Sequence, residues 1–443
     1  MVQFGAVADG VSNNTEVIQK AVDQCSGLGG GTVFFPTGTY MSGTIYLKNN
    51  VTIDLEKSSI IKGIASESAY PESRNGEKGF IRLDSVSNVT ITGEGTIDGN
   101  GGNKVFQKGN NADKRPNLLQ CIGSKNIVIK NIHILNSACW TLHLFNSNKV
   151  FIEGISIYCH SNWNNDGIDI DSKNVTISNC TIDCDDDALC FKSEGKNLCE
   201  NIVVTNCNLA SNCSLIKFGT SSVTGFKNVT ISNCVLHSAS ESNFRFWNKN
   251  IPGVLDSITG ISGIALEVVD GGKMEQINIS NITMDGIQTP LFIRLGSRKN
   301  STGSLKNVLI SNIIATTHSQ IPICISGVPG FYIENVIIRD MMVNCMGGGT
   351  KGDASHLKIP EKEKAYPENR MFGNRLPAYG MYVRHVKNIT LDNIQFYLIK
   401  PDYRPAILFD DAQDITLRAF KATQPEGGQQ KIIEKNSTVK VLN

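Results

Sequence analysis

The chain has 443 residues, and its 42 Lys and Arg side chains nearly balance its 41 Asp and Glu side chains, which leaves a formal net charge of +1. This balance excludes the strongly basic surface of nucleic-acid-binding and membrane-surface proteins. No apolar run approaches the roughly 20 residues of a membrane-spanning helix, and the first residues lack the pattern of a signal peptide. We therefore expect no nucleic-acid or membrane partner. We expect a secreted or periplasmic protein whose chain has been processed, with a cytoplasmic location as the alternative.

The first predicted element is a short amphipathic helix from about Asn14 to Gly27. Thr15 is suited to cap its start, and the glycines at 29–31 end it. Apolar residues recur in it at helical spacing, namely Val17, Ile18, Ala21 and Val22. Within an N-terminal cap of about residues 1–40, this helix is expected to cover the first unpaired strand edges of the repeat that follows.

A short repeat then runs through most of the chain. Each copy has a pair of apolar, mostly β-branched residues, then a polar residue, then usually Asn, and then another apolar pair, which is typical of a short strand followed by a turn. Neighbouring copies are about 23 to 31 residues apart, with two gaps near 50. The copies are Ile127–Asn131, Val150–Gly154, Val175–Asn179, Ile202–Asn206, Val229–Asn233, Ile277–Asn281, Val308–Asn312, Val336–Asp340 and Ile389–Asn393.

This period predicts an all-β fold, a right-handed parallel β-helix in which each turn stacks about 4.8 Å above the last. The repeated Asn side chains would then form an amide ladder inside a bend. A leucine-rich repeat has a similar period, but its fixed Leu positions are missing. We expect one domain over residues 1–443, interrupted by irregular stretches at about 65–80 and 98–118 and by a long loop at about 343–380.

The 13 cysteines are odd in number and scattered. Cys180, Cys207 and Cys234 occupy equivalent repeat positions, where a small apolar side chain suits a stacked interior. We favour buried thiols that fill the core, with some disulfides as the alternative.

Two acidic motifs lie about one repeat apart. Residues 164–169 read Asn-Asn-Asp-Gly-Ile-Asp, residues 185–187 are all Asp, and Asp166 and Asp187 are 21 positions apart. Their side chains could therefore lie one above the other, and their repulsion should keep a proton on one of them near neutral pH. One protonated and one ionised carboxyl group are what hydrolysis of a glycosidic bond requires. A single Asp in such a turn more often binds Ca²⁺ or solvates a bend, but the paired motifs favour catalysis.

These motifs resemble those of family 28 of the glycoside hydrolases, the polygalacturonase family. Residues 164–169 are similar to the family's NTDGxD motif and residues 186–193 to its DDCIAIKS motif, and the likeness extends from residue 2 to about 410. The resemblance implies a right-handed parallel β-helix and inverting hydrolysis of pectic polysaccharides. It also implies Asp186 as the general acid, with Asp166 and Asp187 positioning and deprotonating the attacking water.

Two departures from the family pattern change the expected substrate. Where polygalacturonases carry GHG, this chain reads Cys213-Ser214-Leu215, and where they carry RIK it reads Arg245-Phe246-Trp247. The missing His and Lys argue against an endo-hydrolase of homogalacturonan. Arg245 remains, and Trp247 offers a stacking face for a sugar. We therefore expect a rhamnogalacturonan-type or decorated galacturonan substrate, and exo action because long loops could wall off one end of the cleft.

Further candidates for substrate binding are Lys217 and Arg294, either of which could grip a carboxylate in place of the missing Lys. The alternative for each is a cation on the surface or at a ladder end. His160 and Trp163 precede the first acidic motif and could contact substrate, although a lone His in a turn is more often structural.

Three other functions remain open: an α-L-rhamnosidase on the same scaffold, a polysaccharide lyase, and a non-catalytic glycan-binding β-helix. A lyase would use Arg or Lys as base, with Ca²⁺ at the acidic residues, and would leave an unsaturated product. No His or Cys cluster has metal-site spacing, and no Gly-rich phosphate loop precedes a helix. We expect no cofactor and no metal, a pectic oligo- or polysaccharide as the partner, and a monomer.

Overall fold

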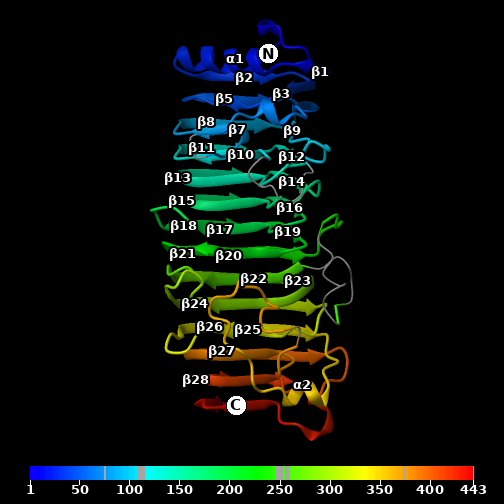
Figure 1. Cartoon of the computed structure of the whole chain (residues 1–443), viewed down its shortest axis with the longest axis vertical. Helices are drawn as coiled ribbons and strands as arrows, with labels where there is room; N and C mark the ends of the chain where they lie inside the picture. The colour runs from blue at the N-terminus through cyan, green and yellow to red at the C-terminus, as the bar shows by residue number, and fades with distance from the viewer. Residues whose placement is uncertain (74–75, 107–114, 245–252, 255–259, 374, 443) are drawn as a thin grey trace. The chain divides into compact units, whose positions relative to one another are not determined.

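A computed structural model gives the structure of residues 1–73, 76–106, 115–244, 253–254, 260–373 and 375–442. Residue contacts divide the chain into two compact units. Unit 1 comprises Met1–Cys190, Asn201–Asn208 and Glu241–Phe244, and unit 2 comprises Phe191–Glu200, Leu209–Ser240 and Arg245–Asn443. The single domain expected from the sequence stays a prediction, and each unit is described by itself. Both have the predicted fold, a right-handed parallel β-helix (Figure 1).

Unit 1 is built from short strands that pair in parallel, turn upon turn. Interior positions of successive turns align, as in the column Val89, Ile127, Val150 and Val175, whose members are each at most 2% exposed. Such columns form the apolar core of the coil. The strands are β1 (Asp9–Asn13), β2 (Gly31–Phe35), β3 (Gly38–Ser42), β4 (Ile45–Tyr46), β5 (Val51–Leu55), β6 (Ser59–Gly63), β7 (Gly79–Asp84), β8 (Ser87–Gly93), β9 (Thr96–Asp98), β10 (Asn117–Ile122), β11 (Lys125–Lys130), β12 (His133–Leu135), β13 (Leu142–Glu153), β14 (Ser156–Cys159), β15 (Ile168–Ser178) and β16 (Thr181–Cys184).

The predicted capping helix is α1 (Thr15–Gly27), and its buried side chains are Ile18, Ala21 and Val22. Its N-cap residue is Asn14, not Thr15 as we predicted. The Thr15 hydroxyl instead accepts a hydrogen bond from Gly43 N (2.7 Å), which joins the helix to the coil.

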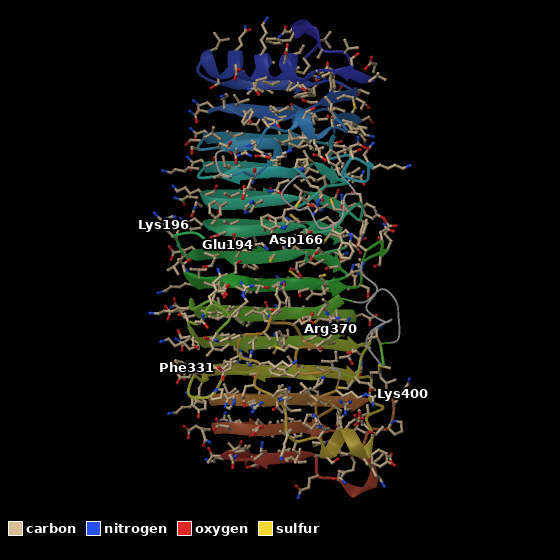
Figure 2. All side chains as sticks on the ribbon, viewed as in Figure 1. Asp166, Glu194, Lys196, Phe331, Arg370 and Lys400 are labelled. Carbon is tan, nitrogen blue, oxygen red and sulfur yellow. The ribbon has the colours of Figure 1, made fainter. Side chains whose placement is uncertain are left out.

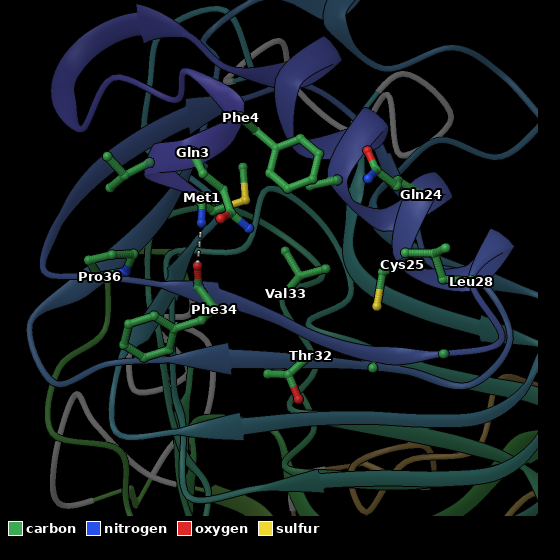
Figure 3. A pocket seen from close by; sticks show the side chains of 14 residues that line it. Met1, Gln3, Phe4, Gln24, Cys25, Leu28, Thr32, Val33, Phe34 and Pro36 are labelled. Carbon is green, nitrogen blue, oxygen red and sulfur yellow. Dashed lines mark hydrogen bonds between the residues drawn. The ribbon is translucent and has the colours of Figure 1, made fainter.

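A pocket of about 750 Å³ lies in this cap, lined by residues of α1, β2 and the short 3-10 helix η1 (Val2–Phe4) (Figure 3). The Met1 amino group closes one side by donating a hydrogen bond to Phe34 O (2.8 Å). None of the predicted site residues lines this pocket.

The repeated asparagines form the predicted ladders with exposed side chains, and Asn179 and Asn206 lie in bends between strands. In unit 1, Asn206 donates to Asn179 (3.4 Å), and in unit 2, Asn281 donates to Asn233 (3.0 Å). All four have a backbone φ between 56° and 57°. This left-handed conformation is tolerated by Asn better than by most other residues, which explains why the repeat keeps Asn at this position.

Unit 2 continues the same kind of coil with longer strands. Residues of β17 (Leu189–Ser193), β18 (Cys199–Thr205) and β19 (Asn208–Ser211) are divided between the two units. The strands of unit 2 are β20 (Ser214–Ser222), β21 (Gly225–His237), β22 (Gly260–Val268), β23 (Lys273–Leu295), β24 (Ser304–Thr317), β25 (Ile323–Ser326), β26 (Ile333–Cys345), β27 (Met381–Leu398), β28 (Ile407–Arg418), β29 (Lys421–Ala422), β30 (Ile432–Lys435) and β31 (Val439–Leu442).

The predicted long loop of unit 2 begins after β26 ends at Cys345, and we call residues 346–373 and 375–380 the cover loop. It contains the short helix α2 (Lys351–Ser355) and runs in front of the unit 2 strands in Figure 1. Its apolar side chains, among them Met371, Phe372 and Leu376, pack on one outward column of the sheet. That column is Ala265, Phe292, Cys324, Tyr382 and Leu408, in register from β22 to β28.

All 13 cysteines are free thiols, and all but Cys25 are buried. Burial raises the pKa of Cys121 to about 11 and that of Cys345 to about 12, so both remain uncharged thiols. The prediction that cysteines fill the core is confirmed. Within the described ranges, no helix combines the length and apolar character needed to cross a bilayer.

Candidate active site

The predicted catalytic carboxylates lie in stacked turns of unit 1. Asp166 lies between β14 and β15, and Asp186 and Asp187 lie between β16 and β17. A backbone hydrogen bond from Gly167 N to Asp187 O (2.9 Å) joins the two turns. The spacing of 21 residues between Asp166 and Asp187 therefore corresponds to one turn of the coil.

The three carboxyl groups are buried and close together. Asp166 and Asp187 are each 4% exposed and Asp186 is 8% exposed. Carboxylate oxygens of Asp166 (labelled in Figure 2) and Asp187 lie within 4.8 Å of each other. Because an O–H···O hydrogen bond spans about 2.7–2.8 Å, one water molecule can donate to both carboxylates at this separation.

Arg115 supports the turn that carries Asp166. Its side chain is 4% exposed, and one terminal nitrogen donates to Ala138 O (2.8 Å) and to Trp163 O. The other terminal nitrogen donates to Asn164 Oδ1 (2.9 Å). One guanidinium thus holds two consecutive residues that lead into Asp166.

His160 lies next to these carboxylates but is turned toward other acidic side chains. Its Nε2 is 2.9 Å from Asp183 Oδ1, and its Nδ1 is 3.8 Å from Asp185 Oδ1, an ion-pair distance. Burial alone would lower the pKa of His160, but the Asp183 hydrogen bond and the charges of both carboxylates raise it to about 9. The ring is therefore an imidazolium at neutral pH.

The segment Glu241–Phe244, also part of unit 1, packs against this cluster. Phe244 N donates to Asp185 Oδ2 (2.8 Å), and Asn243 Nδ2 donates to His160 O (2.9 Å). The ring of Trp163 lies 5.6 Å from that of Phe244. The predicted sugar platform Trp163 is thus partly covered by a neighbouring aromatic ring.

Comparison with known proteins is decisive for the family. The model of "Glycosyl hydrolases family 28" matches residues 25–365, more than half of the chain. The chain belongs to this family. A protein named probable polygalacturonase from Vitis vinifera is 32% identical over 214 residues, which is 44% of each chain. A second protein of that name from Arabidopsis thaliana is 26% identical over 372 residues, covering 79% of this chain and 74% of the other.

The family fold is also seen in a solved structure. The exopolygalacturonase from Thermotoga maritima superposes with a TM-score of 0.64 at 24% identity, covering 77% of this chain and 86% of that chain. This likeness concerns the fold alone. The alignment with the Vitis vinifera relative spans less than half of that protein's length.

In unit 2 of this family 28 chain, Lys217 lies on β20 with its Nζ 3.4 Å from the Tyr366 hydroxyl. Arg294 lies on β23, is 1% exposed, and donates to the carbonyl groups of Gly327 (2.9 Å), Glu361 (2.9 Å) and Lys362 (3.2 Å). The guanidinium we predicted to grip a substrate carboxylate is instead occupied by the protein and anchors the cover loop.

The other predicted site residues have mixed outcomes. We predicted that His160 contacts substrate, but its side chain is 1% exposed and engaged by Asp183 and Asp185. Arg245 and Trp247 lie outside the described residues. The structure thus brings Asp166, Asp186, Asp187 and His160 together in unit 1.

A metal ion could be bound by the carboxylates of Asp166 and Asp187 together with the thiol of Cys190. One possible ligand atom of each of these residues lies within 4.8 Å of the other two. The buried thiol is a poor partner for the hard, oxygen-preferring Ca²⁺ that a lyase uses. The donor set therefore does not fit that role.

Sequence reasoning missed Arg115, Asp183 and Asp185 as supports of the site. Asp185 directly precedes the predicted catalytic residues Asp186 and Asp187, and this adjacency in the sequence was a usable signal. Arg115 lies about 50 positions before the turn it holds and binds it mostly through backbone carbonyl groups. Backbone acceptors carry no signature in the sequence.

Proposed function

We propose that this family 28 protein hydrolyses glycosidic bonds of a pectic polysaccharide, using Asp166, Asp186 and Asp187. The observation that carries the proposal is the approach of the Asp166 and Asp187 carboxylates to within 4.8 Å on stacked turns. Two such carboxylates can hold and deprotonate one water molecule, while a third carboxyl group supplies the proton for the leaving oxygen.

The roles of the three carboxyl groups are those that the family's motifs imply. Asp186 is the general acid, and Asp166 and Asp187 share the attacking water. Oxygens of Asp186 and Asp187 are also within 4.8 Å of each other, closer than the roughly 6.5–9.5 Å usual between acid and base in inverting enzymes. Inversion is therefore proposed on the strength of the motifs rather than of this distance.

The proposed substrate is rhamnogalacturonan-type or decorated galacturonan. Its pectic character is supported by relatives named as polygalacturonases and by others named as endo-xylogalacturonan hydrolases. Cys213 and Ser214 stand where the family's His would be, and Trp247 stands in place of its Lys. An aromatic side chain offers a stacking face instead of a charge, which suits a sugar ring or a methyl edge.

Exo action is supported by the cover loop of unit 2. It packs on the outward column of the sheet from β22 to β28, so that a sugar chain cannot lie on that part of the sheet face. Arg294 and Arg384 hold it in place through the carbonyl groups of Glu361 and Ile359 (2.9 and 2.8 Å).

The test is mass-resolved product analysis on three saturated oligosaccharides: homogalacturonan, rhamnogalacturonan ending in rhamnose, and rhamnogalacturonan ending in galacturonate. We expect a saturated monosaccharide from one of the rhamnogalacturonan members. Cleavage of homogalacturonan would overturn the proposed specificity, and an unsaturated product would identify a lyase. No product from any of the three, with binding retained, would favour a glycan-binding protein.

A further inference from the structure

We propose that the pocket of the N-terminal cap binds an uncharged oligosaccharide, separately from the catalytic carboxylates. Its walls come from η1, α1 and β2 (Figure 3). Within unit 1, α1 lies at the N-terminal end of the coil, whereas Asp166 lies between β14 and β15, further along it (Figure 1). The pocket is therefore a second site, and its occupation does not depend on the proposed hydrolysis.

The pocket has the size and the lining of a site for a small ligand. Its volume of about 750 Å³ falls within the range of about 300–1,000 Å³ that is usual for such sites. Two aromatic rings belong to the lining, those of Phe4 and Phe34, and the Phe34 side chain is 42% exposed. An accessible ring offers a stacking face for the apolar side of a sugar. Other apolar members of the lining are Val2, Ala21, Leu28, Val33 and Pro36.

Three polar side chains of the lining are available for hydrogen bonds to a ligand. Gln3, Gln24 and Thr32 are exposed, and their side chains form no hydrogen bond with any residue in the described part of the chain. A side-chain amide both donates and accepts, and so does a hydroxyl group. These side chains therefore match the hydroxyl groups of a sugar, which also donate and accept.

The charge of the lining selects the class of sugar. Among the 14 described residues that line the pocket, none has a charged side chain. The Met1 amino group also lies there, but it donates to Phe34 O (2.8 Å), and burial lowers its pKa. The carboxylate of a galacturonate residue would lose hydration in the pocket without gaining a side-chain cation, which is unfavourable. A neutral sugar avoids this cost, so the occupant that fits is an uncharged branch of a decorated pectin.

The walls of the pocket are fixed to the coil by side-chain hydrogen bonds. Gln19 of α1 exchanges two of them with the backbone of Tyr46, since Nε2 donates to Tyr46 O (3.0 Å) and Oε1 accepts from Tyr46 N (2.9 Å). The segment after η1 is held by the buried Asn14, whose side chain accepts from Val7 N (2.8 Å) and donates to Val7 O (2.9 Å). A site that is already ordered loses little conformational freedom when a ligand binds, which favours affinity.

Cys25 provides a readout that is specific to the pocket. It belongs to the lining, and all the other cysteines are buried, so a small alkylating reagent should modify Cys25 selectively. Because burial raises the pKa of this thiol, iodoacetamide is applied at about pH 8.5, and mass analysis of peptides follows the modification. Neutral galactan or arabinan oligosaccharides, at about ten times their dissociation constant, should slow the reaction about tenfold. An oligogalacturonate of equal length should leave the rate unchanged.

Two variants of the full-length protein connect this protection to the lining. Phe34→Ala removes a stacking face and should weaken binding of the neutral oligosaccharide about fivefold, and Gln24→Ala removes one amide and should weaken it about threefold. The matched control is Phe151→Ala, because Phe151 is also an exposed phenylalanine of unit 1 but does not line this pocket. Its affinity should equal that of the parent. Calorimetric titration measures the affinities, and a melting curve checks that each variant is folded.

Asp186→Asn separates this site from the proposed function. It should lose hydrolysis but keep the protection of Cys25, and protection in the parent supports the pocket even if the parent hydrolyses nothing. Three results would overturn the proposal: no protection by either neutral oligosaccharide, equal affinity of the parent and both lining variants, or protection by the oligogalacturonate as strong as that by the neutral sugars. If Phe34→Ala fails to fold, Gln24→Ala carries the test.

Discussion

The outward faces of the two units carry opposite chemistry on the same kind of coil. In unit 1, one outward column in register across β7, β10, β13 and β15 is polar and consists of Arg82, Gln120, His143 and Asp169. In unit 2, the outward column from β22 to β28 is Ala265, Phe292, Cys324, Tyr382 and Leu408, and the cover loop packs on it.

The backbone geometry is the same in both places, so the side chains of the outward column decide its use. An apolar column is stabilised when a loop removes it from water. The polar column is buried as well, and its side chains are stabilised by hydrogen bonds within the protein, such as those of Arg82 to Asp84 and of Gln120 to Glu77. This difference teaches that the same coil can bury an outward column in two ways, by packing a loop on apolar side chains or by hydrogen-bonding polar ones.

The largest expected effect is on catalysis in unit 1. Asp186→Asn should lower kcat by about 10³-fold or more, because an amide cannot donate the proton that the leaving oxygen needs. The amide oxygen can still accept from Asp187 N, so thermal stability should change little. Steady-state kinetics and a melting curve measure both. Asp340→Asn, which alters an exposed ladder position of unit 2, is the control and should have parent activity.

The next effect concerns His160 and alkaline pH. Its pKa of about 9, against an ordinary value of 6.5, corresponds to about 3 kcal/mol of stability. The folded state holds the proton more tightly, so this stability is fully present below about pH 6.5 and is lost as pH rises through about 9. Urea unfolding of parent and His160→Gln from pH 6 to about 10 measures the difference. A constant difference between the two proteins would contradict the raised pKa.

A smaller effect is expected at the cover loop of unit 2. Arg294→Met should reduce the free energy of unfolding by about 2 kcal/mol, because buried carbonyl groups lose charged donors. A loosened loop should also release some longer oligosaccharides from a polymeric substrate. Chromatography of the products tests this, with the exposed Arg339→Met as control. An unchanged product pattern together with a destabilised protein would show that the loop does not cause exo action.

The smallest effect is expected from metal removal. The chemistry proposed for Asp166, Asp186 and Asp187 uses no cation, so EDTA should change activity by less than about twofold. A loss of activity that Ca²⁺ restores would favour the lyase alternative.

The sequence was sufficient for the coil and for the stacking of the acidic turns, because both depend on a period that recurs every turn. The same reasoning placed Asn in bends, as at Asn179 and Asn206, and the structure adds the reason, which is the left-handed backbone at these positions. It placed Arg294 in a substrate site. In the structure Arg294 binds the backbone of a loop about 67 residues away in sequence, and such a contact leaves no local sequence pattern. His160 was predicted as a possible substrate contact, with a structural role as the alternative, and its partners Asp183 and Asp185 are identified only by the folded geometry.

The most direct test of the account is hydrolysis of a pectic oligosaccharide in water enriched in oxygen-18, followed by mass analysis of parent and Asp186→Asn reactions. The account predicts a saturated monosaccharide from the parent that carries one heavy oxygen at its anomeric carbon, and essentially none from the variant. An unsaturated, unlabelled product, or equal labelled product from both proteins, would contradict it.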